Sequence, residues 1–371
     1  MRILLVGGEA SLSAELLEYI GDLGDEWEVE SVPDGSAAIV AVSSATIDAV
    51  IVAPVLPDLA PATLLGQIRT LRPETIRIAL IDGDNSQRVP SARIIGVAHR
   101  FLPLPLPPEV LLEALTSLEE LRELLDSPRL RQAIGRIEKL PSPPHLYLSL
   151  MHALEDDEES NAAEIAKLVA ADPAIAAKVL QLSNSAFFNN GRAISDLRGA
   201  VTRLGMATLR DLVLASEVFA LPGMSGPDRN AMQSRALLAS RLAAKMLPAS
   251  SAELGSTAAL LADIGLLLPG VRDERQPADA EETRPGHAEA GAYLMGLWGL
   301  PMPIIEAVAF QLQPGRSNVR SFWVAGAVHV ATALASGTAV DEQYLANVGV
   351  LPKLEQWRAI ADEMMGLSVD A

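Results

Sequence analysis

Residues 47–58 read IDAVIVAPVLPD, and this stretch decides the fold of the first third of the chain. Its apolar run, Ala49–Ala53, has no polar interruption, and the residues after it include the proline and aspartate typical of a turn. A short unbroken apolar run is typical of a strand buried on both faces, as in a parallel sheet. We therefore expect a central parallel strand at 49–53.

Similar strands are expected on both sides of this one, at Ile3–Val6, Trp27–Val32, Ile76–Ile81 and Arg100–Leu102. Helical patterns alternate with them, at Ser11–Leu23, Gly35–Ser44, Ala62–Leu71, Ser91–Gly96 and Pro108–Leu125. Five repeats of strand and helix predict a doubly wound α/β domain, the flavodoxin-like (βα)5 fold, over residues 1–126.

After about Ser127 the strand pattern stops. Helices are expected to begin near Asn161 and Asp172, and further ones at Ser195–Gly205, Asp228–Leu247, Ser251–Leu268, His287–Trp298, Pro303–Gln311, Arg320–Ser336 and Pro352–Met365. The stretch Gly270–Gly286, rich in charge and proline, is expected to be a surface loop. The prediction is a multidomain chain, α/β followed by all-α, with a helical domain at 127–340. A C-terminal helical extension at 341–371 is expected to pack on that domain.

Charge limits the partners of this chain. Its 371 residues carry a formal net charge of -18, and residues 1–126 alone hold 8 Arg, no Lys and 20 Asp or Glu. Such a field repels a phosphate polyanion, because nucleic-acid binding depends on Lys and Arg that replace counterions. We therefore expect no nucleic-acid partner.

The sequence also predicts a cytoplasmic location. There is no cysteine, which excludes disulfides and thiolate metal sites, and the amino terminus lacks the pattern of a signal peptide. The uncharged stretch Ser321–Val340 is long enough to span a bilayer, but it contains His329 and several small polar residues. We expect it to be a buried core helix, without membrane insertion.

The α/β part resembles the receiver domain of response regulators in two-component systems. The matching landmarks are RILLV at 2–6, the strand and VLPD turn at 47–58, and FLPLP at 101–105. The resemblance implies a phosphoacceptor aspartate, an acidic pair that holds Mg²⁺, a switch Ser/Thr and a lysine. All of these would serve phosphoryl transfer.

The positions that this chemistry requires hold other residues. They are Gly7 and Gly8 for the acidic pair, Ala53 for the phosphoacceptor, Ile81 for the switch residue and Leu104 for the lysine. One interpretation makes Asp58 or Asp48 a displaced phosphoacceptor. In the other interpretation Asp58 is a turn residue and Asp48 is a solvated residue at the start of a strand. The favoured interpretation is a pseudo-receiver that keeps the fold and has lost the catalytic site.

The helical part resembles the HDOD family, an output module related to HD-domain phosphohydrolases. The residues that carry the resemblance are EKLPSPP at 138–144, DPAIAAKVLQLSNSAFF at 172–188, ISDLRGAVTRLGMATLRDLVL at 194–214 and HAEAGAYLMGLWGLP at 287–301. In HD enzymes, histidine and aspartate side chains on neighbouring helices hold one or two metal ions that activate water.

Most of the metal-ligand positions implied by this resemblance are substituted. Alanine, at Ala262, replaces the histidine of the His-Asp dyad, and the later histidine pair corresponds to Phe310-Gln311. Asp263, His287 and His329 are the vestigial candidates. They would either hold one metal loosely or be satisfied core residues, and the second interpretation is favoured because a metal site needs an oriented outer shell.

Two degenerate sites inside two apolar cores predict a chain with no enzyme activity, no cofactor and no metal. The expected function is an adaptor in bacterial signal transduction that binds other signalling proteins, with a homodimer as a further possibility by resemblance. The alternative is a sensor that binds a nucleotide, such as a cyclic dinucleotide, in the HD-like cavity. A third hypothesis is a metal-dependent phosphohydrolase.

Overall fold

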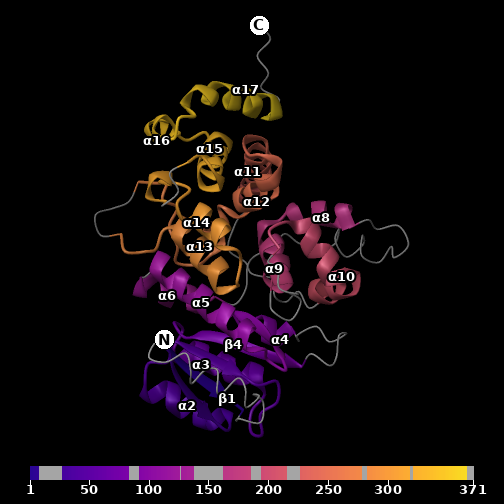
Figure 1. The fold of residues 1–371 in the computed structure, drawn as a ribbon, viewed down its shortest axis with the longest axis vertical. Coiled ribbons are helices and arrows are strands. Elements are labelled where there is room, and N and C mark those ends of the chain that lie inside the picture. Colours follow the sequence, from indigo (N-terminus) through magenta and orange to yellow (C-terminus); the bar gives the residue numbers. More distant parts are fainter. Residues whose placement is uncertain are drawn as a thin grey trace.

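The computed structural model describes residues 1–7, 27–82, 92–125, 127–137, 162–184, 194–214, 226–277, 282–317 and 321–365. Figure 1 shows an α/β part that contains the amino terminus and a larger helical part, with α5 and α6 between them. The expected helix at 11–23, the EKLPSPP motif and Gly8 lie outside the described residues.

A five-stranded parallel sheet forms the first part. Its strands are β1 (Arg2–Val6), β2 (Glu28–Val32), β3 (Ala49–Val52), β4 (Ile76–Asp82) and β5 (Arg100–Leu104), in the spatial order β2-β1-β3-β4-β5. This order is that of the flavodoxin-like fold, so the predicted fold class is confirmed. Every residue of β3 is buried, as its unbroken apolar run predicted.

Four helices of the α/β part are described: α2 (Gly35–Ser44), α3 (Pro61–Leu71), α4 (Ala92–Ile95) and α5 (Pro108–Leu124). α2 begins after Asp34, whose side chain accepts a hydrogen bond of 2.8 Å from the backbone N–H of Ala37. Such a cap satisfies one of the free N–H groups in the first helical turn.

In its described residues the second part consists of helices joined by loops. Its elements are α6 (Pro128–Gly135), α8 (Ala162–Ala170), α9 (Pro173–Asn184), α10 (Leu197–Leu214), α11 (Gly226–Met246), α12 (Ala249–Leu261), α13 (His287–Leu297), α14 (Met302–Ala309), α15 (Val324–Ser336), α16 (Glu342–Asn347) and α17 (Leu354–Met365). Three short 3-10 turns complete it, η4 (Ile264–Leu267), η5 (Pro314–Arg316) and η6 (Leu351–Lys353).

Several helix boundaries differ from the prediction. Asp196 caps α10 in place of Ser195, and Gly205, expected to end this helix, instead interrupts it with a φ of 75° before it continues. The helix expected at Ser251–Leu268 ends at Leu261, and a separate 3-10 turn follows Asp263. α15 is buried along most of its length. Within the described residues, no helix combines the length and apolarity that a membrane span requires.

Two buried arginines of the sheet reach across to the helical part. Arg100, the first residue of β5, donates from Nη2 to the carbonyl oxygen of Gly296 (2.7 Å) and from Nε to that of Leu297 (3.1 Å). Those carbonyls belong to the last turn of α13, where free carbonyl groups and the helix dipole favour a cation. Arg77 of β4 likewise donates to the carbonyl oxygen of Gly135, the last residue of α6 (3.0 Å).

Helix α9 completes this junction. Gln181 donates to the carbonyl oxygen of His99 (3.0 Å), and it accepts from the Lys178 ammonium (2.9 Å), which also lies 4.5 Å from the centre of the Trp298 ring. Burial lowers the pKa of Lys178 to about 7, that of Arg77 to about 9 and that of Arg100 to about 10. The junction is thus a buried, hydrogen-bonded contact rich in basic groups.

Candidate functional site

The carboxyl edge of the sheet is where receivers carry their chemistry, and at the ends of β1 and β3 this chain has two small residues. Gly7 directly follows β1 and has a φ of 114°; a Cβ atom at this position would lie 2.4 Å from the Cβ of Ala53, directly after β3. Any side chain at position 7 would therefore displace the β3 end. Neither residue has a carboxylate, so neither can itself serve as a phosphoacceptor or as an Mg²⁺ ligand.

The other two receiver positions are apolar as well. Ile81 lies within β4, paired with Pro103, and not beyond the strand as its assignment to the switch position implied. Leu104 is the last residue of β5 and is half-buried against the core. Neither side chain has a group that could donate to a phosphoryl oxygen.

Asp58 has a structural engagement in the loop after β3. Its two carboxylate oxygens accept from the backbone N–H groups of Gly35 (2.9 Å) and Ser36 (2.8 Å), and one also accepts from the Ser36 hydroxyl (2.7 Å). These hydrogen bonds, that of the Ser36 side chain first, lower the pKa of Asp58 to about 2. Asp58 thus tethers the start of α2 to the loop after β3.

Asp48 lies at the opposite, amino end of β3. It accepts from the Arg2 backbone N–H (2.7 Å) and from the Arg122 guanidinium (2.8 Å). Burial alone would raise its pKa, but these two hydrogen bonds outweigh burial and lower it. Asp48 is therefore an ion-paired residue far from the receiver chemistry.

In the helical part, the vestigial HD positions do meet at one place. The side chain of Gln311, where an HD enzyme has a histidine pair, donates to the carbonyl oxygen of Ala262 (2.5 Å), where such an enzyme has the dyad histidine. Asp263 and His287 lie beside this contact, with 3.7 Å between Oδ1 and Nε2. Gly265 permits this approach, because a Cβ there would lie 1.9 Å from the carbonyl oxygen of His287.

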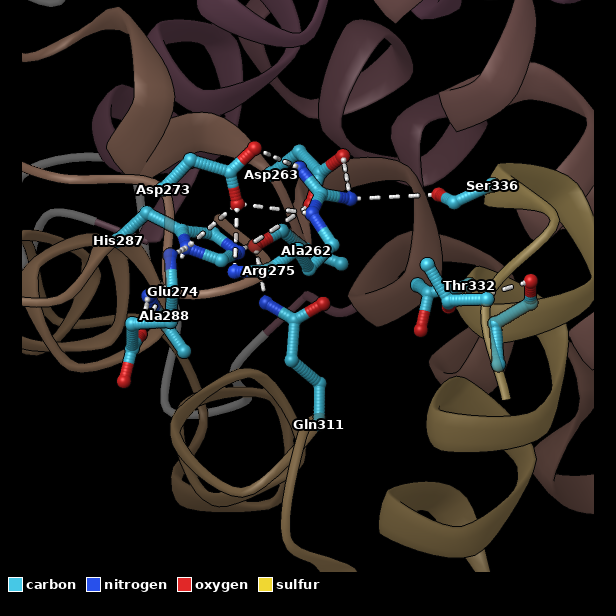
Figure 2. A network of polar contacts seen from close by, with 12 residues as sticks. Ala262, Asp263, Asp273, Glu274, Arg275, His287, Ala288, Gln311, Thr332 and Ser336 are labelled. Atoms are coloured by element: carbon cyan, nitrogen blue, oxygen red, sulfur yellow. Dashed lines mark hydrogen bonds and ion pairs between the residues drawn. The ribbon is translucent and has the colours of Figure 1, made fainter. Parts of the chain in front are cut away.

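A guanidinium lies among the acidic groups of this site. Arg275 donates from Nη1 to Asp263 Oδ2 (3.0 Å) and to the Ser336 hydroxyl (3.2 Å), and from Nε to Asp273 Oδ1 (2.9 Å) (Figure 2). Its own side chain is only 14% exposed. Burial would lower the pKa of Arg275, but the carboxylates of Asp263 and Asp273 outweigh burial and raise it. A fixed internal cation thus offsets the charge that a metal would offset in an HD enzyme.

His287 is held as a neutral ring. Its Nδ1 accepts from the backbone N–H of Glu274 (3.2 Å), so the proton of the neutral ring is on Nε2, facing Asp263 Oδ1. Both of these facing atoms are buried without a hydrogen-bond partner. Burial lowers the pKa of His287 despite the nearby carboxylate of Asp263. A protonated Nε2 cannot bind a metal ion.

His329 does not join this pair. Its Nδ1 contacts the carbonyl oxygen of Gln311 (2.7 Å), and its Nε2 accepts from the backbone N–H of Asp341 (2.9 Å). Both ring nitrogens are therefore used in joining α15 to the start of α16. Within the described residues, no three His, Asp or Glu side chains are arranged to hold a metal ion. The donor set does not fit the metal of an HD enzyme.

The sequence prediction missed Arg275, because the whole of Gly270–Gly286 was expected to be a surface loop. The described part of that segment instead folds over the site and supplies Asp273, Glu274 and Arg275 to it (Figure 2). The run DER at 273–275 gave a weak signal, since a loop rich in both charges can fold onto a buried polar site.

A cavity of about 420 Å³ opens beside this network. Three arginines line it together with polar side chains of α15, and its lining includes Arg272, Arg275, Glu289, Gln311, Arg316 and Thr332. Its volume lies within the range of small-molecule sites, roughly 300–1,000 Å³.

Comparison with known proteins finds a family match in the helical part. Residues 140–314 match the family of HDOD domains. An uncharacterized protein of Treponema pallidum is 26% identical over 200 residues, which are 47% of this chain and 38% of that protein. The chain thus spans well under half of the length of this curated relative.

Solved structures with partial similarity include receiver and HD proteins. The MmoQ response regulator of Methylococcus capsulatus is 20% identical with a TM-score of 0.46, covering 60% of this chain and 98% of its own. The signal receiver domain of an HD domain-containing protein of Pseudomonas fluorescens is 29% identical with a TM-score of 0.28, covering 33% and 89%. A Shewanella amazonensis protein whose name proposes a phosphohydrolase is 24% identical with a TM-score of 0.35, covering 66% and 96%.

The family match covers Asp263 and His287, and the parallel sheet with the order β2-β1-β3-β4-β5 precedes it. The chain therefore carries an HDOD domain behind a receiver-type α/β domain.

Proposed function

We propose that this chain is a non-catalytic signalling adaptor of the bacterial cytoplasm, which acts by binding other proteins. The observation that carries the proposal is the Arg275 guanidinium, paired at 3.0 Å with Asp263 Oδ2 where an HD enzyme would place its metal. A metal ion and a guanidinium compete for the same carboxylate. A chain that builds the cation into its own fold has little use for a catalytic metal there.

The receiver-type edge supports the same proposal independently. Gly7 and Ala53 meet at the position of the phosphorylation chemistry and bring no functional group to it. Both parts nevertheless keep continuous apolar cores. A fold that is maintained without its reaction chemistry retains its surfaces, and binding is the function that surfaces can perform.

The first experiment measures metal content and hydrolysis. The purified full chain is incubated with Mn²⁺, desalted and assayed for bound metal, and its turnover of bis(p-nitrophenyl) phosphate is followed. We expect substoichiometric metal and no turnover above the protein-free rate. Arg275→Gln, which removes the internal cation, is expected to raise Mn²⁺ binding, whereas Arg284→Gln, at an exposed ion pair with Glu282, is the matched control. Saturable turnover by the wild-type chain would overturn the proposal.

The adaptor function itself is tested by crosslinking the full chain in extract of its native organism, followed by mass spectrometry. We expect a reproducible partner that is absent when an unrelated acidic protein of equal charge is the bait. A result with no enriched protein would contradict the adaptor function, whatever the metal assay shows.

A second candidate function is a nucleotide sensor, and the cavity beside the Arg275 network favours it. Arg272 and Arg316 line that cavity and could face phosphate oxygens. Calorimetry with a panel of nucleotides that includes cyclic dinucleotides tests this function. It would require saturable heats of binding that Arg272→Ala abolishes.

A further inference from the structure

A groove that the proposed site does not use lies at the boundary of the two domains, between α5 and the segment that leads from α13 into α14. Its hollow has a volume of about 450 Å³, and residues of both domains line it. It shares no lining residue with the cavity beside the Arg275 network.

The floor of the groove is apolar. Trp298 and Leu300 are each only 4% exposed, while Val110, Leu112 and Met302 are half-buried along its sides. These side chains offer contact to an apolar group from a partner, because their exposed edges remain in water in the chain alone.

The rim of the groove is acidic. Glu109, Glu113 and Glu120 are exposed, line the groove, and stand on one face of α5, at helical spacings of four and seven residues. From Glu109 to Glu120 the helix rises about 16 Å. The amino-terminal 126 residues carry a net charge of -12 in sequence, so the surrounding field has the same sign.

Among the described residues that line the groove the cation is Arg100, and it is already engaged. Its nitrogen atoms donate to the carbonyl oxygens of Ala114, Gly296 and Leu297 and to the Ser117 hydroxyl. It therefore does not offer a free donor to an anionic ligand. The available charge in the groove is negative.

Resting on the proposed adaptor function, we propose that this groove binds a basic amphipathic helical segment of a partner protein. Apolar side chains of that segment would enter the floor, and its lysines or arginines would face the glutamates of α5. Charge complementarity selects this occupant. A nucleotide or an acidic peptide would be repelled, and a small amine is too short to use a rim about 16 Å long.

The test uses a synthetic peptide as the probe. A fluorescein-labelled Lys/Leu peptide of about five helical turns, with its leucines on one face, is titrated with the full chain and followed by anisotropy. Saturable binding that weakens with added salt is expected. A Glu/Leu peptide of the same pattern is expected not to bind.

Charge-reversal variants locate the binding. Glu109→Lys with Glu120→Lys reverses two rim charges and leaves Glu113 intact, because its carboxylate also acts on the pKa of Arg100. This variant is expected to bind the Lys/Leu peptide at least about fivefold more weakly. The matched control reverses two exposed glutamates on other helices, Glu253→Lys with Glu363→Lys, and is expected to change affinity by less than about twofold.

Equal weakening in both variants would mean attraction to the overall negative charge and would overturn the groove. No saturable binding, which is also the result if another part of this chain fills the groove, would overturn it as well. Circular dichroism confirms that both variants fold. The adaptor function is judged separately by crosslinking, so partners found together with an unresponsive groove would reject the groove alone.

Discussion

The two edges of the parallel sheet differ in the contacts that their side chains make. At the carboxyl edge, Gly7 and Ala53 lie in contact with no functional group between them. At the amino edge, Arg77 and Arg100 are buried and hydrogen-bonded to helices α6 and α13. A receiver signals from the first edge. Here the second edge makes buried hydrogen bonds to the helical part, so the two domains are joined through the amino ends of β4 and β5.

The largest effect is expected at the amino edge. Arg100→Met removes the donors to the last turn of α13 and leaves buried carbonyl groups without partners, so the free energy of unfolding should fall by about 3 kcal/mol. Urea unfolding of the full chain measures this. The control is Arg93→Met, at an exposed arginine of α4, which should cost less than about 0.5 kcal/mol. Similar losses in both variants would mean that the junction contributes nothing special.

The carboxyl edge should respond next, and only to added volume. Gly7→Ala places a Cβ against Ala53 at a position with positive φ, and should lower the free energy of unfolding by about 2 kcal/mol. Gly337→Ala is the control, because its φ is 66° and no atom would lie within 4 Å of the new Cβ. If both variants lose the same stability, backbone strain alone explains the loss and the contact with Ala53 contributes nothing to it.

A third prediction concerns pH at the junction. The pKa of Lys178 is about 7 in the folded chain and near 10.5 when unfolded, so between these values the unfolded chain binds more protons. Stability should therefore rise as pH increases from 7 to 8.5, by at most about 1.4 kcal/mol per pH unit. Lys178→Met should flatten this rise, measured by urea unfolding at each pH. An unchanged slope would show that the ammonium is not buried at the junction.

The smallest effect is expected at Asp58. Its pKa is about 2 when folded and near 3.8 otherwise, so its contribution is present above about pH 4 and is lost as pH falls toward 2. The Tm difference between wild type and Asp58→Asn should narrow over that range. Incubation with acetyl phosphate should leave the mass of the wild-type chain unchanged. A gain of one phosphoryl group that Asp58→Asn abolishes would instead identify a phosphoacceptor.

The sequence predicts the structure wherever a local pattern of residues coincides with burial. Ala49–Val52 is apolar because both of its faces are covered. Asp263 and His287, which the resemblance to HD enzymes groups together, lie 3.7 Å apart in the structure. The pattern could not reveal Arg275, since a loop docks through long-range contacts that leave no periodic signal. For the same reason it could not show that Arg77 and Arg100 point out of a strand pair into a domain junction.

The third vestigial candidate shows the same limit. The resemblance groups His329 with Asp263 and His287, but its two ring nitrogens contact the backbone of Gln311 and Asp341. Which way a buried histidine faces depends on the packing of several helices. The helix break at Asp263 likewise lies beside a long-range contact, the close approach of Gly265 to the backbone of His287.

Helix α6 has a practical consequence for cloning. It was assigned by sequence to the helical domain, which begins at residue 127. Yet the carbonyl oxygen of Gly135 accepts from Arg77, and a Cβ at Gly135 would lie 1.7 Å from the carbonyl oxygen of Pro73. A gene fragment that ends at codon 126 would encode a receiver-type domain without α6, the helix that packs on it. A stop after codon 137 would retain that helix, and fragments cut there are the ones to express when the two domains are studied apart.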